Sequence, residues 1–237
     1  MKYAIWFLIV SLTLPAAATA AENQRSGSTA KQTVSVPIYK PPRVGAPAGR
    51  VGGGTRGTGD LPTLSVLAPD HIGLTTQEQP SLYWYLSQPT THPIELSVID
   101  PQSISPLLET QLQLHTRSGI QQVRLADYGV RLKPGMTYRW FVTLIPDPHS
   151  RSKDVVAGGL IERIEPSEAL RAKLTQADQA EKPSIYAEAG LWYNAVAAIS
   201  DLIDTASHAQ RLRQQRAALL EQVGLQDVAA HDIQRGN

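Results

Sequence analysis

Apolar and polar side chains alternate along two aromatic segments of the chain, residues 81–86 and 137–142. Because successive side chains of a β-strand point to opposite faces, this alternation predicts two strands that each bury one face. The buried faces are expected to hold Leu82, Trp84, Leu86, Tyr138, Trp140 and Val142. Trp84, Tyr138 and Trp140 are therefore predicted to be structural residues of a core.

Similar short runs, separated by turn-forming residues, recur throughout residues 61–165. The seven runs are 64–68, 80–87, 93–99, 107–114, 119–126, 136–145 and 155–164. No helical crossover, which parallel strands require, fits between them. The pattern predicts a mainly β protein with some α: a seven-stranded antiparallel β-sandwich of the immunoglobulin or fibronectin type. In such folds a tyrosine entering a late strand bonds to nearby backbone, and a tryptophan fills the space between the sheets.

Residues 166–229 change character, with much alanine, leucine, glutamine and glutamate and with apolar residues at helical spacing. They predict a helical region in which Ser167 begins the first helix and Gly224 follows the last. Residues 185–195 resemble one tetratricopeptide unit. A single such pair cannot bury its apolar face alone, so we expect it to pack on the sandwich. Residues 230–237 are expected to be a disordered tail.

The alternation leaves several aromatic and basic residues on outer faces, where they either meet a covering element or form a binding surface. The candidate binding residues are Arg56, Tyr83, Tyr85, Arg139, Phe141 and Trp192. For Trp192 the alternative to a binding role is a structural one.

The first twenty residues have the pattern of a secretory signal peptide: one lysine, an apolar run of about twelve residues, and small residues before Ala21. The run is shorter than the ~20 residues that span a bilayer. We therefore expect an exported protein, periplasmic or extracellular, with no transmembrane segment after cleavage. Residues 21–60 are rich in proline, glycine and basic residues. They predict a linker that is either simply solvated or in weak contact with an anionic envelope polymer.

The absence of cysteine and the balance of charges exclude several classes of function. The chain of 237 residues contains no cysteine, which excludes disulfides and cysteine-based metal or thiol chemistry. Removal of Lys2 with the signal peptide leaves 21 of the 22 basic residues against 21 acidic ones. A neutral mature chain argues against nucleic acid as a partner.

No linear motif for catalysis withstands inspection of its context. Residues 52–57 match the dinucleotide fingerprint Gly-x-Gly-x-x-Gly, but neither a preceding strand nor a following helix is predicted around them. We predict no catalytic residue and no cofactor. The alternative is an envelope hydrolase or metal-dependent enzyme, whose divalent ion would be held by loop residues Asp70, His71, Asp147, His149 and Asp154.

Ordered motifs then point to a family. They include the glycine-rich segment 52–57, Leu61-Pro62-Thr63-Leu64, the aromatic segments at 80–85 and 138–141, Asp147-Pro148, and Gly190-Leu191-Trp192-Tyr193. In this order they resemble the bacterial family named domain of unknown function 928, over roughly residues 43–229. The resemblance implies an exported protein and brings no activity or catalytic residue. Relatives often carry cysteines where this chain has Thr58 or Gly59, and Pro146, so any disulfide implied there is absent here.

We expect an exported, non-enzymatic binding or scaffolding protein of the bacterial envelope whose partner is another envelope protein or a peptide. An exposed sheet edge could accept a partner strand, or the helical pair could hold a peptide in a groove.

Overall fold

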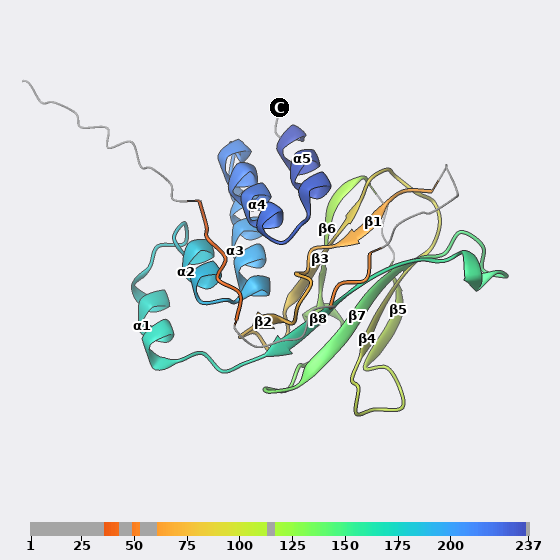
Figure 1. Cartoon of the computed structure of the whole chain (residues 1–237), viewed down its shortest axis with the longest axis horizontal. Coiled ribbons are helices and arrows are strands. Elements are labelled where there is room, and N and C mark those ends of the chain that lie inside the picture. The colour runs from red at the N-terminus through yellow and green to blue at the C-terminus, as the bar shows by residue number, and fades with distance from the viewer. Residues whose placement is uncertain (1–35, 43–48, 53–60, 113–116, 236–237) are drawn as a thin grey trace, which may run out of the picture. The chain divides into compact units, whose positions relative to one another are not determined.

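The computed structural model describes residues 36–42, 49–52, 61–112 and 117–235. Eight strands and five α-helices lie within these ranges (Figure 1). The expected signal peptide, 1–20, and most of the expected linker, 21–60, lie outside the described residues. Within the described ranges, no helix has both the length and the apolar character needed to span a bilayer.

The eight strands are β1 Leu64–Val66, β2 Gly73–Thr75, β3 Ser81–Leu86, β4 Ile94–Ile99, β5 Leu108–Leu112, β6 Gly119–Arg124, β7 Thr137–Leu144 and β8 Val155–Arg163. They form two sheets. The three-stranded sheet has the order β1-β3-β6, and the five-stranded sheet has the order β2-β8-β7-β4-β5.

The predicted fold, a mainly β protein with a seven-stranded antiparallel β-sandwich, needs two corrections. Each expected run contains a strand, but β2 is an eighth strand within the described residues. It pairs in parallel with β8, with Gly73 opposite Ile161. Three residues are too few to show an alternation, so the sequence does not predict β2. Its extended conformation is supported by pairing with β8. With five α-helices beside eight strands, the protein is a mixed α/β protein rather than a mainly β one.

The two sheets contribute to one apolar core. Trp84 of β3 and Trp140 of β7 are both completely buried and belong to the same cluster, together with Leu96 and Leu144. In β4, buried and partly buried residues alternate, as the pattern of the sequence requires. Full burial of each large apolar side chain contributes about 1.5–3 kcal/mol, so this cluster is the main source of stability in the β part.

The helices are α1 Glu168–Gln176, α2 Lys182–Glu188, α3 Trp192–Thr205, α4 Gln210–Gln222 and α5 Gln226–Gln234. The Ser167 hydroxyl accepts a hydrogen bond from the Leu170 N–H (3.2 Å) and so caps α1. The expected disordered tail is instead helical up to Gln234, because α5 buries Val228 and Ala229 against the rest of the fold. Its weakly amphipathic sequence did not predict a helix.

The helical region packs on the sheets. Helix α3 contacts β2 and β3, and α5 contacts β6; Figure 1 shows the helices on this side of the molecule and β5 away from them. At the base of α3, buried Asn194 accepts the Thr76 N–H through Oδ1 (2.9 Å) and donates to the Thr76 hydroxyl through Nδ2 (2.9 Å). This pair of bonds fixes the start of α3 beside the end of β2.

Parts of the expected linker are docked rather than free. Tyr39 is buried; its N–H donates to Oε1 of Gln222 in α4 (2.8 Å), and its hydroxyl lies 2.9 Å from Nε2 of His71. Val51 forms two backbone hydrogen bonds with Gly158 of β8 (2.8 and 3.0 Å). Residues 36–42 and 49–52 therefore belong to the folded unit. The rest of the glycine-rich segment, residues 53–57, lies outside the described residues.

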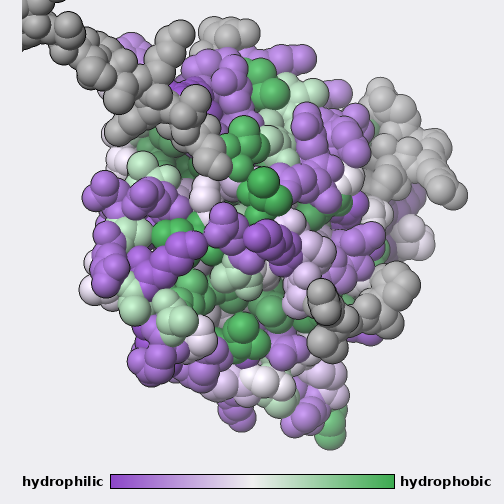
Figure 2. Space-filling model, turned by 60° about the vertical axis from the view of Figure 1, so that its left-hand side comes forward, coloured by the Kyte–Doolittle hydropathy of each residue, from purple (hydrophilic) through white to green (hydrophobic). Residues whose placement is uncertain are grey.

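Arg50 links the helices to the β part in the same region. Its Nη1 donates to the carbonyl oxygens of Ala68 (3.1 Å) and Val223 (2.9 Å), and its Nη2 donates to that of Gly224 (3.4 Å). One side chain thus bridges the loop after β1 and the end of α4. Along this N-terminal segment Val36, Ile38 and Val51 stay exposed. Figure 2, which brings this side forward, shows hydrophobic residues in small patches among hydrophilic ones.

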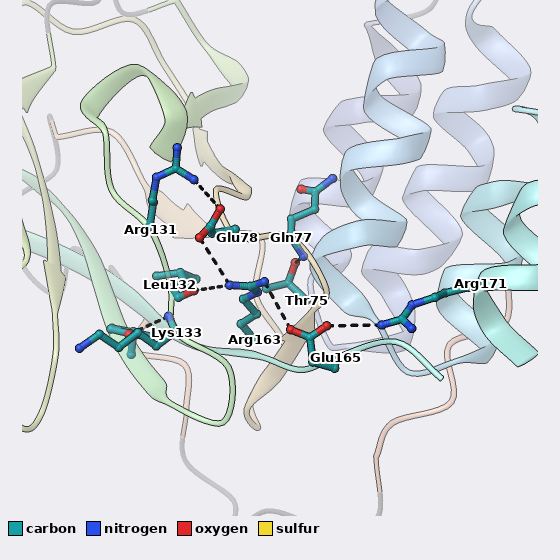
Figure 3. A network of polar contacts seen from close by, with 10 residues as sticks. Thr75, Gln77, Glu78, Arg131, Leu132, Lys133, Arg163, Glu165 and Arg171 are labelled. Carbon is teal, nitrogen blue, oxygen red and sulfur yellow. Dashed lines mark hydrogen bonds and ion pairs between the residues drawn. The ribbon is translucent and has the colours of Figure 1, made fainter. Parts of the chain in front are cut away.

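A chain of charged side chains joins the end of β8 to α1 (Figure 3). Arg163 donates to the Leu132 carbonyl oxygen (2.9 Å) and lies 3.8 Å from Glu78 and 3.4 Å from Glu165. Arg131 pairs with Glu78 at one end of the chain, and Arg171 of α1 pairs with Glu165 at the other (3.5 Å). Alternating charges along the chain hold the connection between the sheet and the helices in place.

Candidate functional site

Tyr83 and Tyr85, the aromatic pair expected on an outer face of β3, lie under the helices. They are only 3% and 6% exposed. The ring of Tyr85 meets that of His231 in α5 edge-on, with 5.1 Å between centroids. We expected either a covering element or a binding surface for this pair, and the structure has a covering element.

Arg139 and Phe141 lie on the outer face of β7 in the five-stranded sheet. Arg139 is exposed and Phe141 is half-buried. The Phe141 ring lies over Gly158 of the neighbouring strand, where an added Cβ would come within 2.3 Å of Phe141 Cδ1. The Phe141 ring therefore packs on its own sheet, and Arg139 is the more accessible of the two.

Trp192 is completely buried at the start of α3, and its indole N–H donates to the Leu67 carbonyl oxygen (2.8 Å). Next to it, the Tyr193 hydroxyl accepts the Trp140 indole N–H (2.8 Å) and donates to the Leu160 carbonyl oxygen (2.9 Å). Burial raises the pKa of Tyr193. These bonds join α3 to both sheets, which is a structural role for Trp192.

The remaining candidates do not come together. Arg56 lies outside the described residues. Asp70 and His71 precede β2, which begins opposite Ile161, whereas the loop holding Asp147, His149 and Asp154 precedes β8 at Val155. Asp147 is paired with Lys153 (3.2 Å), and Asp154 with Arg151 (2.6 Å). Among the described residues, no three acidic or histidine side chains are grouped as metal ligands.

A free sheet edge is formed by β5, whose one neighbour among the described strands is β4. The Leu107 N–H donates to the Val98 carbonyl oxygen (2.8 Å), so the backbone of Val98 faces β5. In antiparallel strands the side to which a residue presents its backbone groups alternates along the chain. Since Val98 is opposite Leu108, Glu109 and Gln111 present their N–H and C=O groups to the free side.

A hollow of about 410 Å³ lies beside this edge. Its walls belong to β5, to β6 and to the short 3₁₀ turn Leu125–Tyr128. The lining residues are Thr110, Gln111, Leu112, Gln122, Val123, Asp127 and Tyr128. Tyr128 is 39% exposed, whereas Leu112 is buried, so the hollow offers apolar surface together with amide and carboxylate groups. Here the edges of the two sheets lie next to each other around open space.

A second hollow, of about 340 Å³, lies between β6 and the helices α3 and α4, close to Tyr83. Its floor holds a buried ion pair: the Arg216 Nε and Nη2 donate to the two Asp232 carboxylate oxygens, both at 2.7 Å. Arg216 Nη1 donates to the Ser200 hydroxyl (2.9 Å), and Arg213 Nη1 donates to Asp232 Oδ1 (3.1 Å). The Tyr83 hydroxyl accepts a hydrogen bond from Gln122 Nε2 (2.8 Å). This hollow is polar and, in part, charged.

Sequence reasoning named Tyr83 but not the other residues of the two hollows. Arg213 and Arg216 belong to a polar stretch of α4 that is typical of a solvated helix face, and Asp232 lies in the expected tail. The spacing of Arg213 and Arg216, three residues apart on one helix, was the one available signal. It does not reveal that Arg216 is buried.

Comparison with known proteins gives a family. A family model described as Domain of Unknown Function (DUF928) matches residues 51–233. No match was found among curated proteins or solved structures. The matched range contains all eight strands and nearly all of the helical region. Because the match covers well over half of the chain, the protein belongs to the DUF928 family.

Proposed function

We propose that this protein is an exported, non-enzymatic binding or scaffolding protein of the bacterial envelope that adds an extended peptide of its partner to β5. The observation that carries the proposal is the free edge of β5, with the backbone groups of Glu109 and Gln111 directed outward beside a hollow of about 410 Å³. In strand addition, main-chain hydrogen bonds supply affinity, and pockets for alternate side chains supply specificity.

The residues of β5 and the length of the strand both suit it to pair with a partner strand. Natural edge strands are often protected by charged side chains, lysine above all, by proline or by a bulge. The sequence of β5, Leu-Glu-Thr-Gln-Leu, contains neither lysine nor proline, and its one charged residue is Glu109. Five residues of free edge are long enough to pair with a strand of typical length. The hollow could then receive a partner side chain that points toward Leu112 and Tyr128.

The strand order supports an immunoglobulin-like sandwich as the scaffold. In those folds one sheet contains strands A, B, E and D and the other contains C, F and G, and variable-type domains add edge strands next to C. The order β1-β3-β6 corresponds to A-B-E, and the order β8-β7-β4-β5 corresponds to G-F-C with one added edge strand; no counterpart of D is found among the described strands. The parallel strand β2 is then a short continuation of β1 at the edge of the other sheet. In that scheme β5 is the extra edge strand found in variable-type domains. We also propose that α2 and α3 form a helical pair like that of one tetratricopeptide unit.

Two other functions receive less support. A peptide groove formed by the helical pair would need an open face, but α3 is covered by the sheets and by α4. A metal-dependent hydrolase would need Asp70, His71, Asp147, His149 and Asp154 to converge, but they belong to two loops that lead to different points along β8.

Selection of displayed peptides tests strand addition. Random peptides of about eight residues, a common strand length with short flanks, are selected on the protein without residues 1–20, and binding is measured by calorimetry. Gln111→Pro removes an outward N–H, and an edge strand tolerates proline at such a position. Gln111→Ala is the matched control because it changes the side chain but keeps the N–H. We expect selected peptides to bind the wild type and Gln111→Ala, and not Gln111→Pro. Equal binding to both variants would contradict strand addition.

Export is tested separately by the intact mass of the protein recovered from the envelope or the medium. Cleavage after Ala20 should give a chain that begins at Ala21. A full-length chain that is found only in the cytoplasm would contradict the proposed location.

A further inference from the structure

We propose that the hollow of about 340 Å³ beside Tyr83 and Arg213 binds a small organic carboxylate. The site lies between β6 and the helices, whereas the proposed strand addition uses β5. The two proposals therefore stand or fall independently.

The arginines of the hollow are its groups suited to an anion. Three arginines and two aspartates line it: Arg213, Arg216, Arg235, Asp204 and Asp232. Asp201, whose negative charge also acts on Tyr83, balances the sum of charges, so a carboxylate would be bound by a particular guanidinium rather than by the net charge. A guanidinium is the side chain best suited to a carboxylate, because its planar fork of N–H groups matches the two oxygens.

Arg213 is the arginine that a ligand would meet. Arg216 is only 5% exposed, and three of its five N–H groups already donate to Asp232 and Ser200. Arg213 has one side-chain hydrogen bond among the described residues, from Nη1 to Asp232, and its side chain is 25% exposed. No second carboxylate of the described residues lies within ion-pair distance of it. One aspartate thus serves two guanidinium groups, and a ligand carboxylate would complete the pairing.

The same cluster could serve only to hold α4 and α5 against the sheet. Burying charges is costly unless each is paired and hydrogen-bonded, and the pair Arg216–Asp232 alone would meet that requirement. Arg213 joins this pair beside open space rather than packed side chains, and a carboxylate would replace the water that otherwise solvates it there.

The other lining groups suit a polar ligand of small size. Polar residues Tyr83, Ser200, Gln121 and Gln122 are among those that line the hollow. The two amide nitrogens already donate to other protein groups, and the Ser200 hydroxyl accepts from Arg216. The Tyr83 hydroxyl, like that of any tyrosine, keeps its proton at neutral pH and can donate; burial raises its pKa further, to about 12. A volume of about 340 Å³ is at the lower end of the range for small-molecule sites.

Calorimetry on the purified protein with two carboxylates and their neutral analogues tests the proposal. D-glucuronate is compared with D-glucose, and N-acetylglycine with N-acetylglycinamide. We expect at least one carboxylate to bind and its neutral analogue not to bind. Binding of glucuronate alone would identify a sugar acid as the ligand class, and binding of N-acetylglycine alone a peptide-like carboxylate. Binding of neither carboxylate up to about 1 mM, or equal binding of a neutral analogue, would overturn the proposal.

Variants locate the site. Arg213→Met keeps most of the aliphatic stem and should weaken carboxylate binding about tenfold or more, as expected for loss of a charge-assisted hydrogen bond. Arg211→Met removes the same charge from the same helix outside the lining of the hollow, and should leave binding unchanged. Tyr83→Phe removes one hydroxyl and should weaken binding severalfold, which provides a second test if Arg213→Met does not fold. Wild-type affinity in folded Arg213→Met, or equal losses in both arginine variants, would place the ligand elsewhere.

Discussion

Tyr138 is the residue at which a single hydroxyl most directly supports the β fold. It enters β7 almost completely buried, and its hydroxyl accepts the backbone N–H of Lys133 at 3.1 Å. The bond closes the turn that leads into the strand. The arrangement is that of a tyrosine corner, in which the hydroxyl returns to backbone a few residues upstream.

Tyr138→Phe should lower the free energy of unfolding by about 1 kcal/mol or more, because the Lys133 N–H loses its partner. Chemical denaturation measures the change. Tyr128→Phe is the control, since this tyrosine is exposed and its loss of a hydroxyl should have little effect. A Tyr138→Phe variant as stable as the wild type would remove the corner from the list of stabilising contacts.

Because Tyr83 is buried, we predict that the free energy of unfolding falls at alkaline pH. Burial, together with the negative charge of Asp201, raises its pKa from 10.0 to about 12. The folded state therefore keeps a proton that the unfolded chain releases, so the stabilising contribution is complete below pH 10.0 and is lost as the pH rises toward about 12. The unfolding free energy should fall there by up to about 1.4 kcal/mol per pH unit from this group. Denaturation at several pH values should give a shallower decline for Tyr83→Phe, and an identical decline would contradict the assignment.

At the scale of elements, the connection between α2 and α3 depends on Gly190. It has φ of +76°, and a Cβ added there would lie 2.9 Å from the Lys40 carbonyl oxygen. Gly129 has a similar φ of +68°, with nothing within 4 Å of an added Cβ. Substitutions at Gly129 and Gly190 can therefore be compared. Both would carry the cost of the left-handed conformation, and only the one at Gly190 would also displace the N-terminal segment.

Alanine at either position should cost about 1–2 kcal/mol for the left-handed conformation. We expect Gly190→Ala to lose more stability than Gly129→Ala in chemical denaturation, because Lys40 must also move. Equal losses would mean that the N-terminal segment yields without cost.

Elements differed in how well the sequence predicted them. The strands at 94–99 and 137–144 alternate over six or more residues, so their type and inward face could be read directly. The strand at 73–75 is too short for this, and the helix at 226–234 has a weak apolar stripe. Both elements are stabilised mainly by what they contact: β2 by β8, and α5 by β6 and α4.

At the scale of the whole molecule, the N-terminal segment fastens the helices to the β part. Arg50 donates to carbonyl oxygens of Ala68, Val223 and Gly224, which belong to both parts. Tyr39 supports the same junction from the other side, packing edge-on against Trp192 at 5.0 Å between ring centroids.

Arg50→Met should lower the unfolding free energy by about 2 kcal/mol, because partly buried carbonyl groups lose a charged donor. Arg139→Met, which removes an exposed arginine from the outer face of β7, serves as the control and should change stability little. Hydrogen exchange should become faster at the end of α4 and in the loop after β1 in Arg50→Met alone. Unchanged exchange in both places would show that the segment does not hold the two parts together.

The sequence by itself determined the local features: most of the strands and helices, with β2 and α5 as the exceptions, the apolar side of the longer strands, where α1 begins, and the family. These follow from periods of two and 3.6 residues and from ordered motifs, all of which act over short distances along the chain. Only the tertiary structure decided that Tyr83 and Tyr85 are covered, that Tyr39 and Arg50 are docked, and that Arg216 meets Asp232 beside a hollow. The physical reason is that alternation indicates which face a side chain is on, whereas burial and charge pairing depend on segments far away in the sequence.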